Sequence, residues 1–312
     1  MSIQIPPRAE TSNTDRVEPG RAGRTRSSRI WRRARRSNRI PWLPISIVVL
    51  ILILPALFAD LLTVHDPLRG TLGDRLIPPG WMEGGSWTYP LGTDKQGRDI
   101  MTRIIYGARI SLTVSSLTIL IGAVVGSTLG LLAGYFGGWI DRMVSWLIDT
   151  FLSLPHVLLA LVIVAAIGPS FVTIVVIIAV TIWASFARQV RGETLSVRET
   201  EYVARARVAG ARSWRILMRH ILPNVANTLI VLATLQVGVV ILEESSLSFI
   251  GAGIPRPNPS WGVMVADGRD QILTSWWISF FPGLAILLVV LSLNLMGDWL
   301  RDFLDPKMRQ RQ

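Results

Sequence analysis

Long apolar blocks without charged side chains alternate along the chain with shorter polar segments. A membrane hydrocarbon core of about 30 Å needs roughly 20 helical residues to cross it. The blocks long enough for this are 41–59, 110–140, 150–187, 221–242 and 271–297. The block 150–187 is too long for one crossing, and a helix-breaking Gly168-Pro169 pair lies near its middle. The pattern therefore predicts an all-α polytopic membrane protein with six transmembrane helices.

The lysines and arginines predict how these helices are oriented. If the N-terminus is cytoplasmic, the inner segments hold 24 of the 32 Lys and Arg residues and the outer segments hold eight. Cytoplasmic loops of membrane proteins carry an excess of positive residues. We therefore expect both termini in the cytoplasm. Acidic residues of the same outer segment balance the outer cations between Lys95 and Arg109.

The first 40 residues contain eleven arginines and carry a net charge of +8. A basic run can bind nucleic acid, but only Trp31 offers a ring for base stacking, and a charge-free block follows at once. We interpret residues 1–40 as a basic, disordered cytoplasmic tail and predict no nucleic-acid partner. Because no small-residue cleavage site follows the apolar block, we expect that block to stay in the lipid bilayer.

This topology divides the chain into segments with different roles. The expected segments after the tail are a first transmembrane helix at 41–64, a periplasmic segment at 65–109, a five-helix core at 110–306 with a cytoplasmic coupling loop at 192–222 and an external loop at 246–272, and a tail at 307–312. Within the periplasmic segment, Ile100, Ile104 and Ile105 predict a short amphipathic helix that leads into the second span.

The composition excludes several kinds of site. The chain has no cysteine, which rules out disulfides, thiolate metal sites and cysteine nucleophiles. Its three histidines, His65, His156 and His220, are scattered, so we predict no metal site. No Gly-rich phosphate loop ending in Gly-Lys-Ser/Thr is present. We therefore predict no catalytic residue and no cofactor bound by this chain.

The coupling loop contains the long arginine-rich stretch "EYVARARVAGARSWRILMRHILPN", residues 201–224. Ser196 and Glu199 fit a capping box that would start a helix. Gly210 can end that helix in a left-handed cap, Ser213 can cap a second one, and Pro223 fits the first turn of span five. We expect two short helices at the membrane surface, joined by a tight bend.

Small residues on this stretch would let another protein approach closely, and the arginines around them would form directional charge pairs with an acidic partner. The alternative is that these arginines only satisfy the positive-inside rule and contact lipid head groups. The candidate docking residues are Glu201, Ala204, Arg205, Ala206, Arg207, Gly210, Ala211, Ser213, Leu222 and Pro223.

The stretch resembles the cytoplasmic loop of ABC importer permeases, whose pattern is Glu-Ala-Ala, three residues, Gly, nine residues, then Ile-x-Leu-Pro. Ala206, Gly210, Leu222 and Pro223 match in register, whereas Ala204, Arg205 and His220 replace the family's Glu, middle Ala and Ile. Glu201, one helical turn earlier, is a candidate substitute for the missing Glu.

Other stretches resemble the second permease subunit of dipeptide, oligopeptide and nickel importers. They are "PLGTDKQGRDIMTRIIYGARISL" from residue 90, "ILEESSLSFIGAG" from 241, "PSWGVMVADGR" from 259 and "FPGLAILLVVLSLNLMGDWLRDFLDP" from 281. The resemblance covers about residues 42–306 and implies the MetI-like fold of type I ABC importers, located in the bacterial inner membrane.

The same resemblance implies an assembly. Its expected members are this chain, a second homologous permease, two cytoplasmic ABC ATPase subunits that bind ATP and Mg²⁺, and an extracytoplasmic solute-binding protein. The expected function is to form half of the translocation pathway for di- or oligopeptides or a related small solute. Glutathione, opines and nickel chelates stay open as substrates. The alternatives are a secondary transporter or a structural membrane subunit that acts without ATPase partners.

Polar residues in membrane spans are candidates for the solute pathway. The candidates are Asn227, Gln236, Glu243 and Glu244, all on span five. The competing interpretation for each is hydrogen bonding between helices. Gly122, Gly126, Gly130 and Gly134 are spaced by four residues, which predicts close packing of span two against another helix, either within the chain or in the partner permease.

Overall fold

The computed structural model describes residues 40–304, and the predicted tails at 1–40 and 307–312 lie, but for Ile40, outside the described residues. Within 40–304 the chain is helical and forms no strand. Five helices there are long and apolar enough to cross a membrane, and a sixth crossing exists if two bent helices count as one span. This agrees with the six predicted spans.

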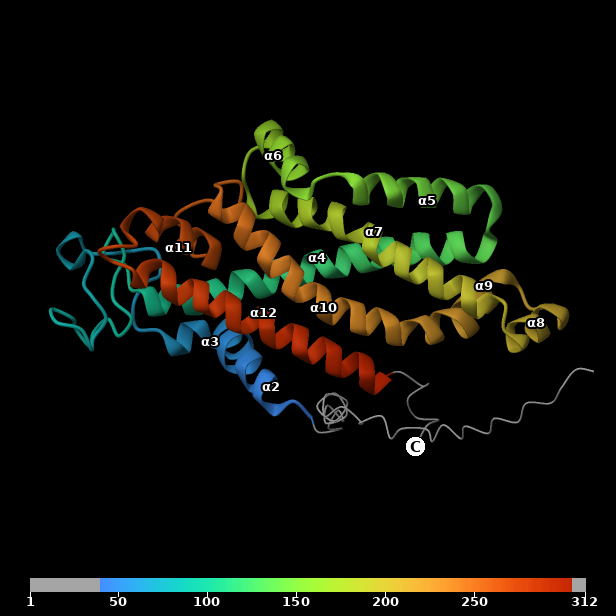
Figure 1. Ribbon diagram of the computed structural model, residues 1–312, viewed down its shortest axis with the longest axis horizontal. Helices are drawn as coiled ribbons and strands as arrows, with labels where there is room; N and C mark the ends of the chain where they lie inside the picture. Colours follow the sequence, from blue (N-terminus) through green and yellow to red (C-terminus); the bar gives the residue numbers. More distant parts are fainter. Residues whose placement is uncertain (1–39, 305–312) are drawn as a thin grey trace, which may run out of the picture. The chain divides into compact units, whose positions relative to one another are not determined.

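The helices follow one another as shown in Figure 1. Span one combines α2 (Trp42–Val48), the π-helical turn η1 (Val49–Ile53) and α3 (Leu54–Leu62). The later elements are α4 (Ile100–Phe136), α5 (Gly138–Ser153), α6 (His156–Ile167), α7 (Phe171–Arg198), α8 (Glu201–Val208), α9 (Ser213–Ile216), the π-helical turn η3 (Leu217–Ile221), α10 (Leu222–Phe249), α11 (Trp261–Gly268) and α12 (Trp277–Leu304). Short 3₁₀ turns lie at Leu72–Asp74 and Arg269–Gln271.

The third span is broken. The sequence predicts a span before Gly168 with a kink at Leu154-Pro155, and α5 and α6 meet there with a bend of 87°. Pro155 cannot donate a backbone hydrogen bond, so the helix restarts after it. The predicted break at Gly168 is confirmed, because Gly168 has a φ of +85° and the Ser170 side chain caps α7.

Several helices are longer than the charge-free blocks. α4 begins at Ile100, where the Asp99 carboxylate accepts from the Met101 and Thr102 amides, so the helix predicted to lead into span two is the first part of span two itself. α7 runs past residue 187 to Arg198, and carboxylates on α5 lie opposite its arginines: Asp149 pairs with Arg188 at 2.9 Å and Asp141 pairs with Arg191. The helix therefore extends beyond the block that hydropathy marks.

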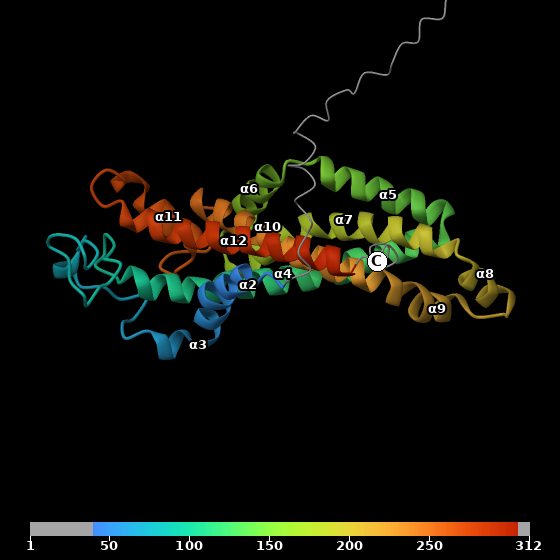
Figure 2. The ribbon, with the colours of Figure 1, turned by 60° about the horizontal axis from the view of Figure 1, so that its bottom comes forward.

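The glycine ridge packs α4 against α7, and the two helices run side by side in both views (Figures 1 and 2). A Cβ placed on Gly126 would lie 2.6 Å from Phe186 Cβ, and Cβ atoms on Gly130 and Gly134 would crowd Ala187 and Thr194. The predicted close packing is confirmed. Its partner is a helix of the same chain, so the alternative that the ridge packs against a partner permease is wrong.

A buried cluster of charges lies at the end of the bundle that holds the start of α4 and α11. Arg98 Nε donates to Asp94 Oδ2 at 2.7 Å, and Arg103 Nε lies 3.7 Å from the same oxygen. All three side chains are less than a tenth exposed. Trp277 Nε1 donates to the Thr93 carbonyl and Trp261 Nε1 to the Ile104 carbonyl. The segment before α4 is thus fastened to α11 and α12.

We expect Asp94→Asn to destabilise this outer end strongly. The variant removes the carboxylate that both buried guanidinium groups contact, which leaves Arg98 with Asp267 at 3.8 Å, and removing one partner of a buried pair costs about 3–5 kcal/mol. The measurement is the thermal unfolding midpoint of the purified chain in detergent. The matched control is Asp66→Asn, because Asp66 pairs with Arg69 at a site where the arginine side chain is 90% exposed. Equal shifts in the two variants would contradict a structural role for the buried cluster.

Candidate functional site

The coupling loop starts later than the sequence predicts. α7 continues to Arg198, and α8 follows after only two residues, with Thr200 as its N-cap residue. The predicted capping box at Ser196 and Glu199 is therefore wrong, since these residues lie in α7 and at its end. The Thr200 hydroxyl instead donates to the Val197 carbonyl at 2.6 Å. Residues 192–198 of the predicted loop belong to the membrane-spanning helix.

Gly210 ends α8 in the left-handed conformation, as predicted, with a φ of +78°. Its amide donates to the Arg207 carbonyl, and the Ala211 amide donates to the Ala206 carbonyl, which is the Schellman pattern of a helix end. No atom lies within 4 Å of the position that a Cβ would take at Gly210. A side chain there would project away from the rest of the chain.

The second helix of the loop is the start of span five. Ser213–Phe249 forms one 37-residue helix. Ser213 is the first residue of this helix, and no side chain caps the helix start with a hydrogen bond. The predictions of a Ser213 cap and of a separate surface helix are therefore wrong. Pro223 has no N–H to donate and would interrupt a regular α-helix. The wider π turn Leu217–Ile221 precedes it directly, and the helix continues.

The loop buries one face and exposes the other. Its buried side chains, Val203, Ile216, Leu217 and Ile221, pack with Leu131, Val190 and Val225 of the bundle. The exposed candidates are Glu201, Ala204, Arg205, Arg207, Gly210, Ser213 and Pro223, whereas Ala206, Ala211 and Leu222 are half-buried. Arg205 pairs with Glu201 at 2.9 Å, with both side chains at least 80% exposed. Such a pair contributes little to stability, so both charges are available to a partner.

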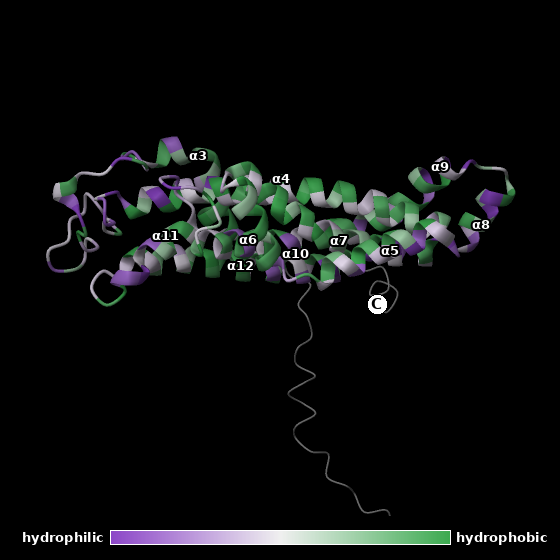
Figure 3. Ribbon diagram, turned by 90° about the horizontal axis from the view of Figure 1, so that it is seen from above, coloured by the Kyte–Doolittle hydropathy of each residue, from purple (hydrophilic) through white to green (hydrophobic). Residues whose placement is uncertain are grey.

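Figure 3 shows hydrophilic residues gathered around α8 at one end of the bundle and in the segments near α11 at the other, with hydrophobic residues along the spans between them. The coupling loop therefore lies at the end that the charge distribution predicts to be cytoplasmic. We call this the cytoplasmic end, and the end with α11 the outer end.

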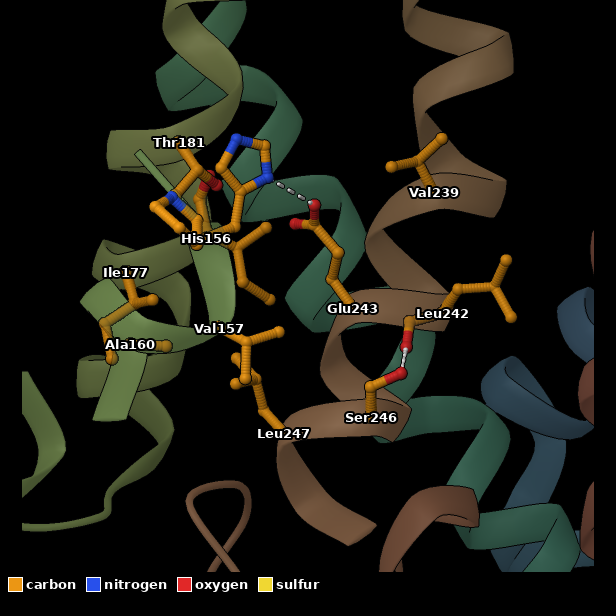
Figure 4. A pocket seen from close by; sticks show the side chains of 12 residues that line it. His156, Val157, Ala160, Ile177, Thr181, Val239, Leu242, Glu243, Ser246 and Leu247 are labelled. Carbon is orange, nitrogen blue, oxygen red and sulfur yellow. Dashed lines mark hydrogen bonds and ion pairs between the residues drawn. The ribbon is translucent and has the colours of Figure 1, made fainter. Parts of the chain in front are cut away.

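Glu243 lies in a cavity of about 370 Å³ between α6, α7 and α10, which we call the outer cavity. Its Oε1 lies 3.3 Å from His156 Nδ1, so the pair links α10 to the first residue of α6 (Figure 4). Most other lining side chains are apolar, among them Ala160, Ile177 and Leu242. Glu243 and His156 are the ionisable groups among the lining residues.

Glu244 points elsewhere. It is fully buried, its Oε1 accepts from the Ser248 hydroxyl at 2.7 Å, and that hydroxyl accepts from the Ile254 amide. The position favours hydrogen bonding between α10 and the loop before α11 over a place in the solute pathway. Gln236 is half-buried and lines neither the outer cavity nor the inner cavity described next.

Asn227 lies in a second cavity of about 560 Å³ at the cytoplasmic end, which we call the inner cavity. Asn224 and Thr228 line it from the same helix. Its lining residues are Gln189, Glu193 and Val197 on α7, Asn224, Asn227, Thr228, Val231, Leu232 and Leu235 on α10, and Arg301 and Leu304 on α12.

Comparison with known proteins now decides the family. Residues 126–310 match the family described as "Binding-protein-dependent transport system inner membrane component". The chain belongs to this family. It is an inner-membrane permease subunit of an ABC importer and not itself an enzyme.

Among the relatives of this permease is the dipeptide transport system permease protein DppC of Alkalihalophilus pseudofirmus, 44% identical over 84% of each chain. Another is the glutathione transport system permease protein GsiD of Pectobacterium atrosepticum, 40% identical over 92% of this chain and 93% of that one. A chain of the MetNI methionine ABC transporter in an inward-facing conformation aligns with a TM-score of 0.55 at 18% identity, covering 66% of this permease and 98% of that chain. This last likeness shows the MetI-like fold.

Sequence reasoning missed part of what the permease brings together. His156 can be interpreted from the sequence as the support of a kink, and the structure also makes it the partner of Glu243. Gln189, Glu193 and Arg301 carry no local signal that places them beside Asn227. Within the described residues no group of three or more His, Asp or Glu side chains could hold a metal ion.

Proposed function

We propose that this permease forms half of the translocation pathway of an ATP-driven importer for di- or oligopeptides. The expected complex adds a second homologous permease, two ATPase subunits that bind ATP and Mg²⁺, and an extracytoplasmic binding protein. The observation that carries the substrate class is the 44% identity to a dipeptide permease over 84% of both chains. The tripeptide glutathione in the name of a second relative belongs to the same chemical class.

The coupling loop supports the ATPase partners of the proposal. It is anchored through its buried face, and the helices on its two sides are membrane spans, α7 and the helix from Ser213. A rigid element fixed to two spans would pass a displacement of a docked ATPase on to both of them. The exposed arginines provide the charge complementarity that an acidic docking cleft requires.

The proposal is tested by purifying the tagged chain from its host in mild detergent and identifying the proteins that accompany it. A second six-span permease and ATPase subunits are expected, and the reconstituted complex should take up a labelled dipeptide at the expense of ATP. A protein that stays free of partners in several detergents would overturn the proposal and favour a secondary transporter.

Within this function, the outer cavity is proposed as part of the peptide pathway. A free peptide carries an ammonium group at its amino end, and the Glu243 carboxylate is the acidic group lining that cavity. His156 Nδ1 lies 3.3 Å from this carboxylate in the cavity (Figure 4). The ammonium would replace the imidazole as the partner of Glu243.

We expect Glu243→Gln to lower the rate of dipeptide uptake at limiting substrate by about 10- to 100-fold, because a hydrogen bond to a charged group is worth about 1.5–3 kcal/mol. Uptake by proteoliposomes containing the complete complex is the measurement. Ser246→Ala is the control, since Ser246 lines the same cavity but its hydroxyl donates to Leu242 of its own helix. An unchanged rate in Glu243→Gln would remove Glu243 from the pathway.

A further inference from the structure

The inner cavity gathers polar side chains from helices that are distant in the sequence. Gln189 and Glu193 come from α7, Asn227 from α10 and Arg301 from α12. Its volume of about 560 Å³ falls within the range of about 300–1,000 Å³ that small-molecule sites occupy. It lies at the cytoplasmic ends of these helices, since α7 ends at Arg198 and α12 at Leu304.

Two of these side chains carry opposite charges. Within residues 40–304 neither the Glu193 carboxylate nor the Arg301 guanidinium makes a side-chain hydrogen bond or an ion pair. The neighbouring arginines of α7 behave differently: Arg188, Arg191 and Arg198 each contact a carboxylate. A cavity that presents one free carboxylate, one free guanidinium and side-chain amides has the complement of a zwitterion with peptide bonds.

We propose that the inner cavity is a second peptide site, filled from the cytoplasm by a small zwitterionic peptide. Glu193 accepts hydrogen bonds from the peptide ammonium, Arg301 binds the peptide carboxylate, and Gln189 and Asn227 bond to the peptide amide. This inference rests on the proposed function, because it takes the imported class of solute as the ligand.

The position of the inner cavity gives occupancy a consequence for transport. One wall is α7, which leads into the coupling loop, and another is α10, which belongs to the helix that leaves the loop at Ser213. A peptide bound to α7, α10 and α12 together stabilises their present spacing, since a ligand favours the state that it binds. Movement of the coupling loop against these helices then becomes less favourable. Peptide that accumulates inside the cell therefore slows its own import.

The test uses the complete complex in proteoliposomes with ATP and Mg²⁺ inside and loaded binding protein outside. Uptake of a labelled dipeptide is compared with and without the unlabelled dipeptide in the lumen, and each variant is compared only with itself. Luminal dipeptide is expected to lower wild-type uptake by about fivefold or more, the lower end of usual coupling between sites. In Glu193→Gln and Arg301→Gln, uptake with luminal dipeptide should equal uptake without it.

The matched controls are Asp149→Asn and Arg188→Gln, whose side chains pair on the α5 side of α7 and do not line the inner cavity. Luminal dipeptide should still inhibit uptake in these two control variants. A dipeptide acetylated at its amino end and amidated at its carboxyl end should not inhibit, because it lacks both charges. If a variant fails to transport, the thermal unfolding midpoint of the wild-type complex still reports binding: the free dipeptide should raise it and the blocked one should not.

The possible results are distinguishable. A wild-type complex that imports the dipeptide but ignores it in the lumen overturns this inference and leaves the proposed function intact. No import of any peptide overturns the proposed function and the inference with it. Inhibition that follows the phosphatidylethanolamine content of the liposomes, and not the luminal peptide, would assign the cavity to a zwitterionic lipid head group and overturn the peptide site.

Discussion

Gly210→Asp is expected to abolish transport by the assembled importer while the chain still inserts and folds. The left-handed backbone at Gly210, with a φ of +78°, is one that aspartate tolerates better than most residues. No atom lies near the position of its Cβ, so the new carboxylate meets no part of this chain. It projects instead from the bend of the coupling loop, where the ATPase is proposed to dock.

A charge that loses its water in an interface without gaining a partner costs about 2–5 kcal/mol of binding free energy, which corresponds to a loss of docking of roughly thirtyfold or more. The measurement combines recovery of the ATPases on the tagged permease with dipeptide uptake. Gly210→Asn adds a side chain of similar size without the charge. This variant should retain more ATPase recovery and more dipeptide uptake than Gly210→Asp.

The matched control for Gly210 is Gly138→Asp. Gly138 is exposed, has a φ of +56° and has no atom near its Cβ position, but it lies at the start of α5, outside the coupling loop. It should keep ATPase recovery and uptake. Normal uptake in Gly210→Asp would contradict docking at this bend, and equal losses in both variants would assign the effect to backbone strain.

Gly126→Leu is expected to prevent α4 and α7 from packing and so to remove the folded permease from the membrane. The Cβ alone would overlap the Trp183 carbonyl and lie 2.6 Å from Phe186 Cβ. Neither atom is the flexible end of a side chain, so the helices themselves must separate. Overpacking of this kind typically costs about 1–3 kcal/mol, and more where the backbone cannot move.

The measurement for Gly126→Leu is the amount and the thermal unfolding midpoint of monodisperse protein after extraction. Val125→Leu on the same helix is the control, because Val125 is 43% exposed. The unfolding midpoint of Gly126→Ala should lie between those of Gly126→Leu and Val125→Leu. A midpoint for Gly126→Leu equal to that of Val125→Leu would show that α4 and α7 do not pack as closely as the structure indicates.

Features that depend on neighbouring residues could be predicted from the sequence. Crossing a bilayer requires a run of apolar side chains, so the six spans follow from the charge-free blocks. The left-handed turn at Gly210 and the break at Gly168 depend on the backbone freedom of one residue. The spacing of Gly122 to Gly134 places these residues on one helix face, which indicates close packing.

Other features depended on residues that are distant along the chain. The charge-free block ends at residue 187, but α7 continues to Arg198, with Asp141 and Asp149 of α5 opposite its arginines. Ser213 has the composition of a cap, yet the helix that it starts joins span five, so no separate surface helix forms. Leu154-Pro155 marks a possible kink, whereas the bend of 87° depends on how α6 packs.

The sequence by itself therefore determined the number of spans, their expected orientation, the family resemblance and the arginine-rich loop with its glycine bend. Only the tertiary structure decided that the glycine ridge packs inside the chain, that Glu243 meets His156, and that Glu193 and Arg301 share a cavity with Asn227. The physical reason is the range of each signal. Hydropathy and backbone conformation act within a few residues, whereas a cavity is formed by helices whose side chains meet only after the chain has folded.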